Sequence, residues 1–288
     1  KEEEKEEKGE KGEKEKEKVK KTPVAAIHES PKRNQVDLPR QNSEDIVRTA
    51  EQMVHQLKPF VPCDPGDKAR KWAKFCSCNK TMSGLPSRIC YFPVLGQILR
   101  VAEPNQSTMS QFVARELNDD DYNLRQLILN SGDIILDVGA NLGMTSILIA
   151  KLNPNVRIVS VEANPGTYKY LSENVLANGL ASRITHINRA LANKNGMSVS
   201  ISDCGLKGVA GVRSHIITNH ERHPVSSSCF SQSVETATVE KVLEDNHVSS
   251  IALLKMDCEG CEVELLPQIY ALPKGFIKQS VGECHSHF

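Results

Sequence analysis

The sequence predicts an α/β fold with a doubly wound, mostly parallel sheet, and three observations lead to this prediction. Residues 134–138 and 158–161 are short apolar runs that end in turn residues, as buried parallel strands do. Residues 144–152 between them fit a helix. A later apolar run at 251–256 again ends in polar residues. Strands that alternate with helices are typical of a parallel sheet covered by helices.

The turn after the first strand carries the residues expected to face a ligand. Gly139 and Gly143 frame it, and Asn141 between them is one of the few non-glycine residues that tolerate a left-handed backbone. Asp137 lies at the end of the first strand, and Glu162 ends the second. A carboxylate at the tip of the second strand of a βαβ unit can accept two hydrogen bonds from a ribose diol.

The acid at the end of the first strand discriminates among nucleoside cofactors. A dinucleotide-binding turn favours G-x-G-x-x-G, whereas this turn reads D-x-G-x-N-x-G. Asp137 would repel a pyrophosphate, but it suits a cofactor with an amino acid cation and a sulfonium. The pattern therefore indicates S-adenosylmethionine, with the turn glycines beside its methionine part and Glu162 at its ribose.

Three motifs resemble those of the FkbM-type methyltransferases. They are Asp137-Val-Gly-Ala-Asn-Leu-Gly143, Val161-Glu-Ala-Asn-Pro165 and Leu254-Lys-Met-Asp-Cys-Glu-Gly-Cys-Glu262. The family pattern is roughly DVGANxG, ExxP and LKxDxEGxE, and the order here is the same. The resemblance covers about residues 108–288 and implies the Rossmann-like sheet of class I methyltransferases.

Two acids follow the apolar run at 251–256. Asp257 and Glu259 are expected at the carboxyl edge of the sheet, where open α/β sheets bind ligands. Carboxylates there can accept a proton from an acceptor hydroxyl or bind Mg²⁺. Alternatively, Asp257 only caps a helix that starts near Gly260. We assign both acids a catalytic role and predict no metal site.

The end of the chain holds secondary site candidates. Family members place an acid and often a histidine after the strand expected at 276–281, which points to Glu283 and His285. The sequence stops at Phe288, whereas a helix and a final antiparallel hairpin normally follow in this fold class. We therefore expect the domain to lack its last strands.

The middle of the domain is less regular. A helix is predicted at 166–177 and a strand at 184–187. Asn193 follows them, where it could bind the adenine edge or cap a turn, and both interpretations stay open. Residues 197–234 are rich in Ser, Gly and His and poorly periodic, which fits a lid or substrate loop, or disorder. A helix is predicted again from 238.

Three histidines in this middle region invite a metal hypothesis. They are His215, His220 and His223. No paired carboxylate or regular element is expected to hold them, so we do not assign them to a metal.

The first hundred residues divide into two predicted parts. Residues 1–42 are a charged low-complexity tail and linker, expected to be disordered, although a binding role stays open. Residues 43–107 form an N-terminal extension with an amphipathic helix, an irregular cysteine-containing lobe, and a hairpin around a four-residue loop at 93–96. The methyltransferase-like domain then takes 108–288.

The nine cysteines are scattered, unlike a secreted disulfide framework. Those of the N-terminal lobe, among them Cys76, Cys78 and Cys90, match no strong zinc spacing and are interpreted as free thiols. Cys258 and Cys261 form a C-x-x-C that we interpret as small hydrophobes. This usage favours a reducing, cytoplasmic location. The tripeptides that begin at Asn79 and Asn105 match glycosylation acceptors, although such short patterns recur by chance.

Charge and hydropathy narrow the possible partners. Lys and Arg together number 36, as do Asp and Glu, so the net charge gives no pointer to nucleic acid or to an anionic membrane. No apolar run approaches the roughly 18 residues that a membrane-spanning helix needs. We therefore expect neither a nucleic-acid partner nor a membrane segment.

The resemblance and the residue pattern together predict an S-adenosylmethionine-dependent methyltransferase that acts on an oxygen of a small-molecule or glycan acceptor. A catalytically inactive adenosyl-binding or scaffolding domain is the first alternative, because of the expected missing strands and the charged tail. A nicotinamide-dependent oxidoreductase is the second, and Asp137 and Asn141 argue against it.

Overall fold

The structure, a computed structural model, describes part of the chain, and all of this part belongs to one compact unit, Arg40–Phe288. The predicted tail, the cysteine-containing segment at 56–74, His220, His223 and His285 lie outside the described residues. The described ranges are 43–55, 75–81, 83–105, 107–203, 215–217 and 230–283.

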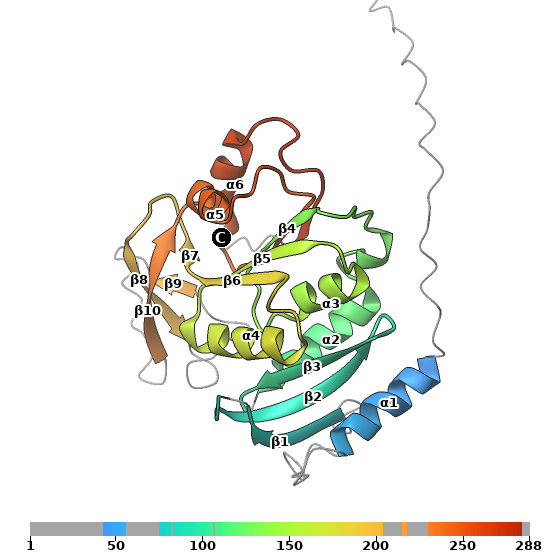
Figure 1. Ribbon diagram of the computed structural model, residues 1–288. Helices are drawn as coiled ribbons and strands as arrows, with labels where there is room; N and C mark the ends of the chain where they lie inside the picture. Colours follow the sequence, from blue (N-terminus) through green and yellow to red (C-terminus); the bar gives the residue numbers. More distant parts are fainter. Residues whose placement is uncertain are drawn as a thin grey trace, which may run out of the picture. The chain divides into compact units, whose positions relative to one another are not determined.

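A five-stranded sheet forms the centre of the unit (Figure 1). Its strand order is β12-β11-β4-β5-β6, and all four pairings are parallel. The apolar runs read from the sequence therefore form the predicted parallel strands. The last strand is shorter than the predicted 276–281, with only an isolated bridge between Ile277 and Ile251 before it. The bounds, in sheet order, are Ser280–Gly282, Leu253–Met256, Ile134–Val138, Arg157–Glu162 and Ile184–Asn188.

Helices cover both faces of this sheet. The helices α3 (Met144–Leu152) and α4 (Pro165–Ala177) share one apolar core with Ile135, Ile158 and Ile184, whereas α5 (Val239–Asp245) and α6 (Glu262–Ala271) share a second core with Leu136, Val159 and Leu254. Neighbouring residues of one strand contribute to opposite cores, because successive side chains of a strand point to opposite faces. The doubly wound α/β class is therefore confirmed.

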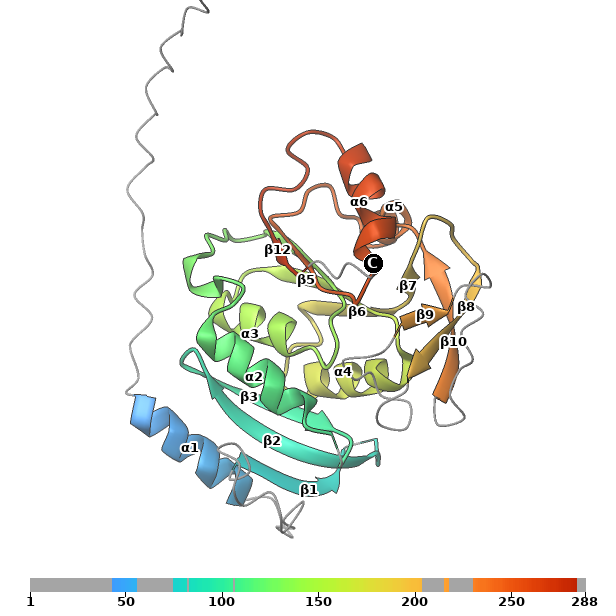
Figure 2. The same ribbon diagram turned by 180° about the vertical axis from the view of Figure 1, so that it is seen from behind.

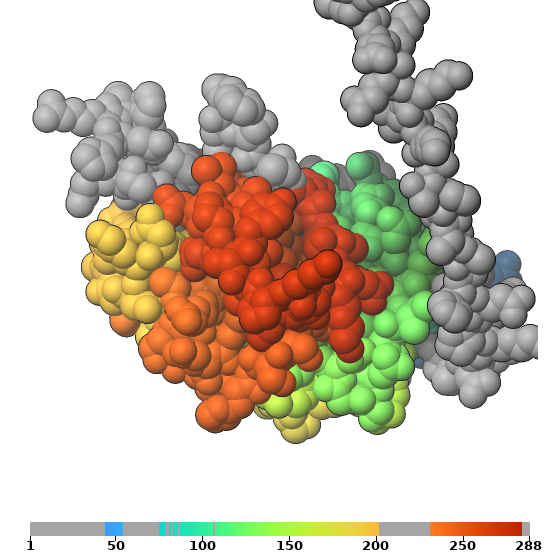
Figure 3. Space-filling view, turned by 90° about the horizontal axis from the view of Figure 1, so that it is seen from above, coloured from blue at the N-terminus to red at the C-terminus, as the bar shows by residue number. Residues whose placement is uncertain are grey.

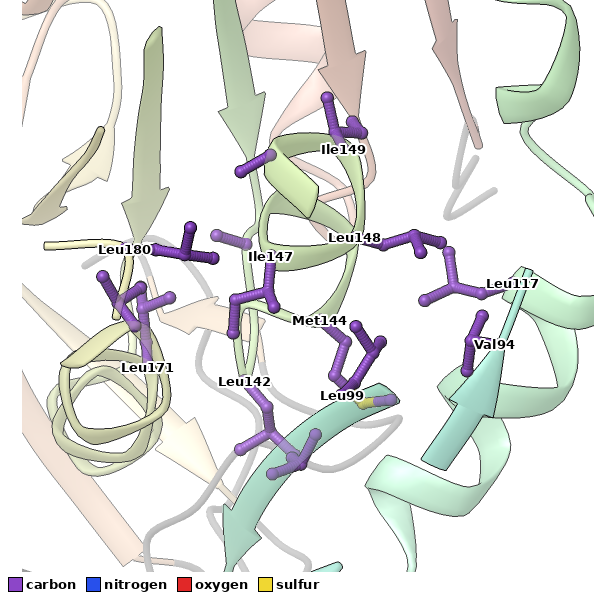
Figure 4. Packing of buried hydrophobic residues seen from close by; sticks show 14 of the residues in the cluster. Val94, Leu99, Leu117, Leu142, Met144, Ile147, Leu148, Ile149, Leu171 and Leu180 are labelled. Carbon is purple, nitrogen blue, oxygen red and sulfur yellow. The ribbon is translucent and has the colours of Figure 1, made fainter. Parts of the chain in front are cut away.

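A second layer of strands packs beneath α3 and α4. It is an antiparallel sheet of β1 (Cys76–Lys80), β2 (Pro86–Val94) and β3 (Gln97–Glu103). In Figure 4, Met144 of α3 points toward Leu99 of β3. Leu148 of the same helix points toward Leu117 and Val94. The helices α1 (Ser43–His55) and α2 (Met109–Asp119) flank this sheet (Figure 2).

Polar contacts fix this layer to the domain. The side-chain amide of Asn174 on α4 accepts a hydrogen bond from the backbone of Ala102 (2.6 Å) and donates to the carbonyl of Ala102 (3.0 Å) and to that of Leu142 (3.0 Å). Asn178 bonds the backbone of Arg100 in the same way. These residues join segments far apart in the sequence, so the 43–107 extension is packed onto the α/β domain. The sequence boundaries at 42 and 107 stay predictions.

The predicted hairpin at β2–β3 is present, but its loop has two residues rather than four. Val94 pairs with Gln97, which leaves only Leu95 (φ 44°) and Gly96 (φ 79°) in the turn. Two consecutive residues with positive φ make the tight turn that matches the twist of an antiparallel pair.

The interpretation of the N-terminal cysteines as free thiols is wrong for this sheet. The β1–β2 register places Cys76 directly opposite Cys90, and the two form a buried disulfide. Cys78 is also disulfide-bonded. The pairing depends on strand register, which the spacing of cysteines in the sequence does not reveal.

The region expected to be irregular, 197–234, contains strands. A separate four-stranded sheet has the order β7-β10-β8-β9. Alternating short polar and apolar side chains, as in Ser198-Val-Ser-Ile, form β8, which pairs with β10 over six residues. The described part of this region is therefore regular, and a role as a lid or substrate loop stays a prediction. The bounds are Ala190–Leu191, Phe230–Ala237, Ser198–Asp203 and His215–Ile217.

Candidate functional site

The carboxyl ends of β4, β5 and β11 bring the predicted site residues to one edge of the sheet. The parallel register sets Lys255 of β11 beside Asp137 of β4, and Asp137 beside Ser160 of β5. Residues in register on neighbouring strands point to the same face. Sequence positions more than a hundred residues apart thus form one polar row at the strand tips.

A buried lysine joins the two acids expected at this edge. The Nζ atom of Lys255 lies 3.3 Å from Oδ1 of Asp137 and 3.7 Å from Oδ2 of Asp257, and it donates to the carbonyl of Gly139 at 2.9 Å. Lys255 is only 3% exposed. Burial lowers the pKa of Lys255, but the carboxylates of Asp137 and Asp257 outweigh this effect and raise the pKa. Lys255 therefore carries its charge between them.

Asp137 lies beneath the turn rather than at its surface. It is fully buried, and its Oδ2 accepts a 2.6 Å hydrogen bond from Ser146 of α3. Ser146 in turn lies 2.7 Å from the hydroxyl of Ser160. A direct contact of Asp137 with a bound cofactor is a prediction; the contacts seen here hold β4, α3 and β11 together.

The turn itself has the predicted left-handed backbone. Gly139, Asn141 and Gly143 have φ values of 74°, 52° and 82°. A Cβ atom on Gly139 would lie 1.8 Å from the carbonyl oxygen of Asp257, and one on Gly143 would lie 2.4 Å from a methyl group of Leu171. At Gly139 the backbone of a neighbouring segment leaves no room for a side chain, whereas at Gly143 the positive φ is the main reason for glycine, because the methyl group of Leu171 can shift.

Glu162 closes the turn from the tip of β5. Its Oε2 accepts from the backbone of Asn141 (2.8 Å), and its Oε1 accepts from the backbone of Asn164 (2.7 Å). Burial raises the pKa of Glu162 to about 7, against the lowering effect of these two bonds. Each oxygen has lone-pair capacity left for a further donor.

Asn141 contributes an unused acceptor at the same place. Its side-chain oxygen is buried and accepts no hydrogen bond within the described part of the chain. Buried polar atoms are nearly always paired in native proteins, and the exceptions call for an explanation. A ligand donor above the turn would supply the missing partner.

The loop after β11 presents Asp257 and Glu259. The hydroxyl of Tyr122 donates to Oδ2 of Asp257 at 2.8 Å. Glu262, the first residue of α6, accepts hydrogen bonds from the backbones of Cys258 (3.0 Å) and Gly260 (2.8 Å) in the loop before the helix. The hydrogen bond from Tyr122 and the ion pair with Lys255 hold the side chain of Asp257 at the sheet edge. Glu259 has a left-handed backbone with φ 56°.

Cys258 and Cys261 are disulfide-bonded to each other, and both pack against the second core as the small hydrophobes that the sequence predicted. The bridge spans Glu259 and Gly260 and lies between Asp257 and α6. Close sequence spacing alone could not distinguish two packed thiols from this bond.

Three residues of the site region lie outside the set assigned from the sequence. Besides Lys255, they are Glu116 on α2 and Tyr122, which follows α2. Burial, together with the carboxylates of Glu283, Asp257 and Asp121, raises the pKa of Glu116 to about 7. Among these three residues, only Lys255 could have been found from the sequence. It lies inside an apolar strand, and a buried lysine needs a charged partner.

Other predicted residues are less central. Asn193 is exposed after β7, and no described contact joins it to the sheet edge; the neighbouring Asn195 accepts a hydrogen bond from the backbone of Thr238, the N-cap residue of α5, at 2.7 Å. Glu283 lies at the edge through its backbone bond to Met256 (3.0 Å). In Figure 3 the red segment near the C-terminus lies beside a green segment from earlier in the chain. Lys278 and Asp133 form an ion pair of 3.0 Å.

Two features are absent from the described ranges. No helix there is long and apolar enough to cross a bilayer. No group of three or more His, Cys, Asp or Glu side chains among those residues is placed to hold a metal ion.

Comparisons with known proteins extend this picture. The family described as "Methyltransferase FkbM domain" matches residues 137–285. The chain is 47% identical over 49 residues to the O-methyltransferase imqG of Aspergillus flavus, covering 17% of this chain and 20% of that protein. It is 25% identical over 209 residues to the 31-O-demethyl-FK506 methyltransferase FkbM of Streptomyces tacrolimicus, covering 63% of this chain and 80% of that protein.

A solved structure of methyltransferase FkbM from Methylobacillus flagellatus matches with 16% identity and a TM-score of 0.32, covering 49% of this chain and 30% of that one. The matched lengths differ widely: the chain spans about a fifth of the Aspergillus protein and four fifths of the Streptomyces protein.

Proposed function

The chain belongs to the FkbM methyltransferase family, and from this premise we propose that it transfers a methyl group from S-adenosylmethionine to an oxygen of a small-molecule or glycan acceptor. The observation that carries the proposal is the site at the tips of β4, β5 and β11. There, a family-specific turn, a carboxylate and a buried ion-paired lysine meet around an unused acceptor.

The residues present fit this cofactor. Glu162 has acceptor capacity for the two ribose hydroxyls, and the free side-chain oxygen of Asn141 suits a donor such as the amino group of the methionine part. The turn at Gly139 and Gly143 gives the backbone its close approach. Asp137 acts from below, because its ion pair with Lys255 fixes the turn through the carbonyl of Gly139. Asn193 at the adenine edge stays a prediction.

The cofactor supplies a methyl group on a sulfonium that is already activated. What remains for the protein is alignment of the acceptor oxygen and exclusion of water, which together can contribute roughly 7–11 kcal/mol. Asp257, with its side chain 24% exposed, is placed to accept the proton of an acceptor hydroxyl. The hydroxyl of Tyr122 orients its carboxylate. Glu259 is the second candidate base from the same loop.

Cofactor binding gives the first test. Calorimetric titration with S-adenosylmethionine should show binding by the chain. A Glu162→Gln variant should bind more weakly by about 1–3 kcal/mol, because the ribose donors lose a charged acceptor. Glu240→Gln, a change of an exposed acid on α5, is the matched control and should bind like the unchanged chain.

Methyl transfer gives the second test. Labelled S-adenosylmethionine is incubated with hydroxylated small molecules and glycans, and transfer of label to an acceptor supports the proposal. An Asp257→Asn variant should bind the cofactor normally and transfer slowly. Binding without transfer to any acceptor would favour an inactive adenosyl-binding or scaffolding domain. Binding of a nicotinamide cofactor in place of S-adenosylmethionine would instead favour an oxidoreductase.

The main support for the cytoplasmic location predicted from the cysteines no longer holds. That argument assumed free thiols, whereas Cys76 and Cys90 are bonded to each other. The absence of a nucleic-acid partner stays a prediction from the balanced charge.

A further inference from the structure

The three-stranded sheet contains a disulfide bond that indicates in which cellular compartment the chain folds. The disulfide between Cys76 and Cys90 joins two strands, and these residues are 4% and 0% exposed. Such a bond is part of the packed interior rather than an exposed, exchangeable pair. Structural disulfides form in oxidising environments such as the lumen of the endoplasmic reticulum and are rare in the cytosol. The same compartment attaches glycans to Asn-x-Ser/Thr tripeptides.

The first and third residues of one such tripeptide lie on a turn next to this sheet. It is Asn105-Gln106-Ser107, whose middle residue is not proline. The turn is closed by a hydrogen bond from the backbone of Ser107 to the carbonyl of Pro104 at 2.8 Å. Asn105 lies inside this turn, between β3 and α2, and is exposed.

The two ends of the tripeptide are held very differently. Ser107 is 2% exposed, and its hydroxyl donates to the buried carboxylate of Glu103 at 2.8 Å. The same carboxylate also accepts from the backbone and hydroxyl of Ser110 (2.9 and 2.6 Å). These bonds anchor the turn from inside and leave the side chain of Asn105 on the outside. Folding can therefore bury Ser107 after attachment while keeping a modified Asn105 in solvent.

We propose that Asn105 carries an N-linked glycan. The glycan lies clear of the candidate site, because α2 separates the two. Asn105 precedes this 11-residue helix, whose length is about 16 Å, whereas Tyr122 follows it and reaches Asp257. The modification does not depend on the proposed methyl transfer, and either can fail without the other.

The second tripeptide of this kind is a weaker site. Asn79-Lys80-Thr81 lies at the end of β1, where Asn79 pairs with Ser87 of β2. Thr81 is 6% exposed, and its hydroxyl accepts from the backbone of Leu85 at 2.9 Å. Asn79 is thus part of a strand pair, whereas Asn105 lies exposed in a turn. Asn79 therefore serves as the internal comparison in the test.

The test is a peptide map of the native protein isolated from its own cells. The protein is treated with peptide N-glycosidase F in heavy-oxygen water, which converts a glycan-bearing asparagine into a labelled aspartate. Label at Asn105 supports the proposal. An unlabelled peptide that contains intact Asn105, with or without label at Asn79, overturns it.

Variants identify the attachment site independently. The full chain is secreted from cultured animal cells behind a cleavable signal, and its gel mobility is compared before and after the glycosidase. Asn105→Gln should remove the part of the glycosidase-dependent mobility shift that a glycan at Asn105 produces. Ser107→Thr keeps the hydroxyl and should preserve this shift. Asn105→Gln alters only an exposed side chain, so its secreted yield should equal that of the unchanged chain. An unchanged shift in Asn105→Gln would overturn the proposal.

Discussion

Two buried carboxylates with similar partners perform different tasks in this molecule. Glu103 and Asp137 are both fully buried, each accepts a 2.6 Å bond from a serine hydroxyl, and each has a cation within 4 Å. The cation is Arg88 for Glu103 and Lys255 for Asp137. Composition and burial therefore do not distinguish the two clusters.

The difference lies in what else the cation touches. Arg88 and Glu103 belong to the hairpin β2–β3, and the serine partners Ser107 and Ser110 follow within seven residues. Lys255 instead reaches the carbonyl of Gly139 and the partly exposed Asp257 at the sheet edge. A buried ion pair thus indicates a functional site only where it continues to a group that a ligand can reach. The first cluster ties a layer together; the second ties a turn to a candidate base.

Removing the cation of the second cluster should have the largest effect. Lys255→Met removes the cation between two carboxylates, and breaking one side of a buried ion pair costs about 3–5 kcal/mol. Denaturant unfolding should show this loss. Lys278→Met, which removes a half-exposed lysine paired with Asp133, is the control and should cost less than about 1 kcal/mol. Equal losses in the two variants would mean that Lys255 is not the link described here.

Changing the first cluster should affect stability alone. Glu103→Gln keeps the shape but removes the charge that accepts three hydrogen bonds from Ser107 and Ser110, and hydrogen bonds to charged groups are worth about 1.5–3 kcal/mol. The free energy of unfolding should fall by about that amount, while the affinity for S-adenosylmethionine stays unchanged in calorimetry. A loss of affinity like that of Glu162→Gln would contradict the division between the two clusters.

Glu162 allows a pH test of the ligand side. Burial raises its pKa to about 7, so the free protein protonates Glu162 below that pH. Protonation removes the charged acceptor, and affinity for S-adenosylmethionine should fall with decreasing pH, approaching about tenfold per pH unit. The stability contribution has the opposite sign: it is present below the pKa of the unfolded chain and is lost as the pH rises through about 7.

Two variants identify the residue whose titration causes this pH dependence. Glu162→Gln cannot titrate, so its affinity should be lower and flat across the range. Glu116 also has a pKa of about 7, raised by burial and by Glu283, Asp257 and Asp121. Glu116→Gln should therefore keep the slope if Glu162 is its source. A flat profile in Glu116→Gln would move the titrating group to α2.

The sequence predicted the part of the site that is local in the chain. Asp137, Gly139, Asn141 and Glu162 all lie within one strand–helix–strand unit, where the order of elements fixes their relative positions. Asp257 was predicted because parallel strands end at one edge of a sheet. None of these inferences needed a long-range contact beyond strand pairing.

The parts that the sequence did not predict depend on packing between distant segments. Tyr122 meets Asp257 only because α2 lies against the sheet layers, and its own sequence pattern is that of an ordinary amphipathic helix end. The Cys76–Cys90 bond depends on the register of β1 and β2. The strands in 197–234 were missed because short serine-rich alternation carries little hydrophobic signal.

The smallest expected effect concerns the link between Tyr122 and Asp257. Tyr122→Phe keeps the ring over Lys255 and removes one hydroxyl, so the loss of stability should be about 0.5–1.5 kcal/mol. If the hydroxyl only supports the fold, methyl transfer should be unaffected once the protein is folded. If it orients Asp257, the turnover rate should fall at saturating acceptor while cofactor affinity is retained. A rate equal to that of the unchanged chain would mean that Asp257 does not need the hydroxyl of Tyr122. The second cluster would then not extend beyond Lys255.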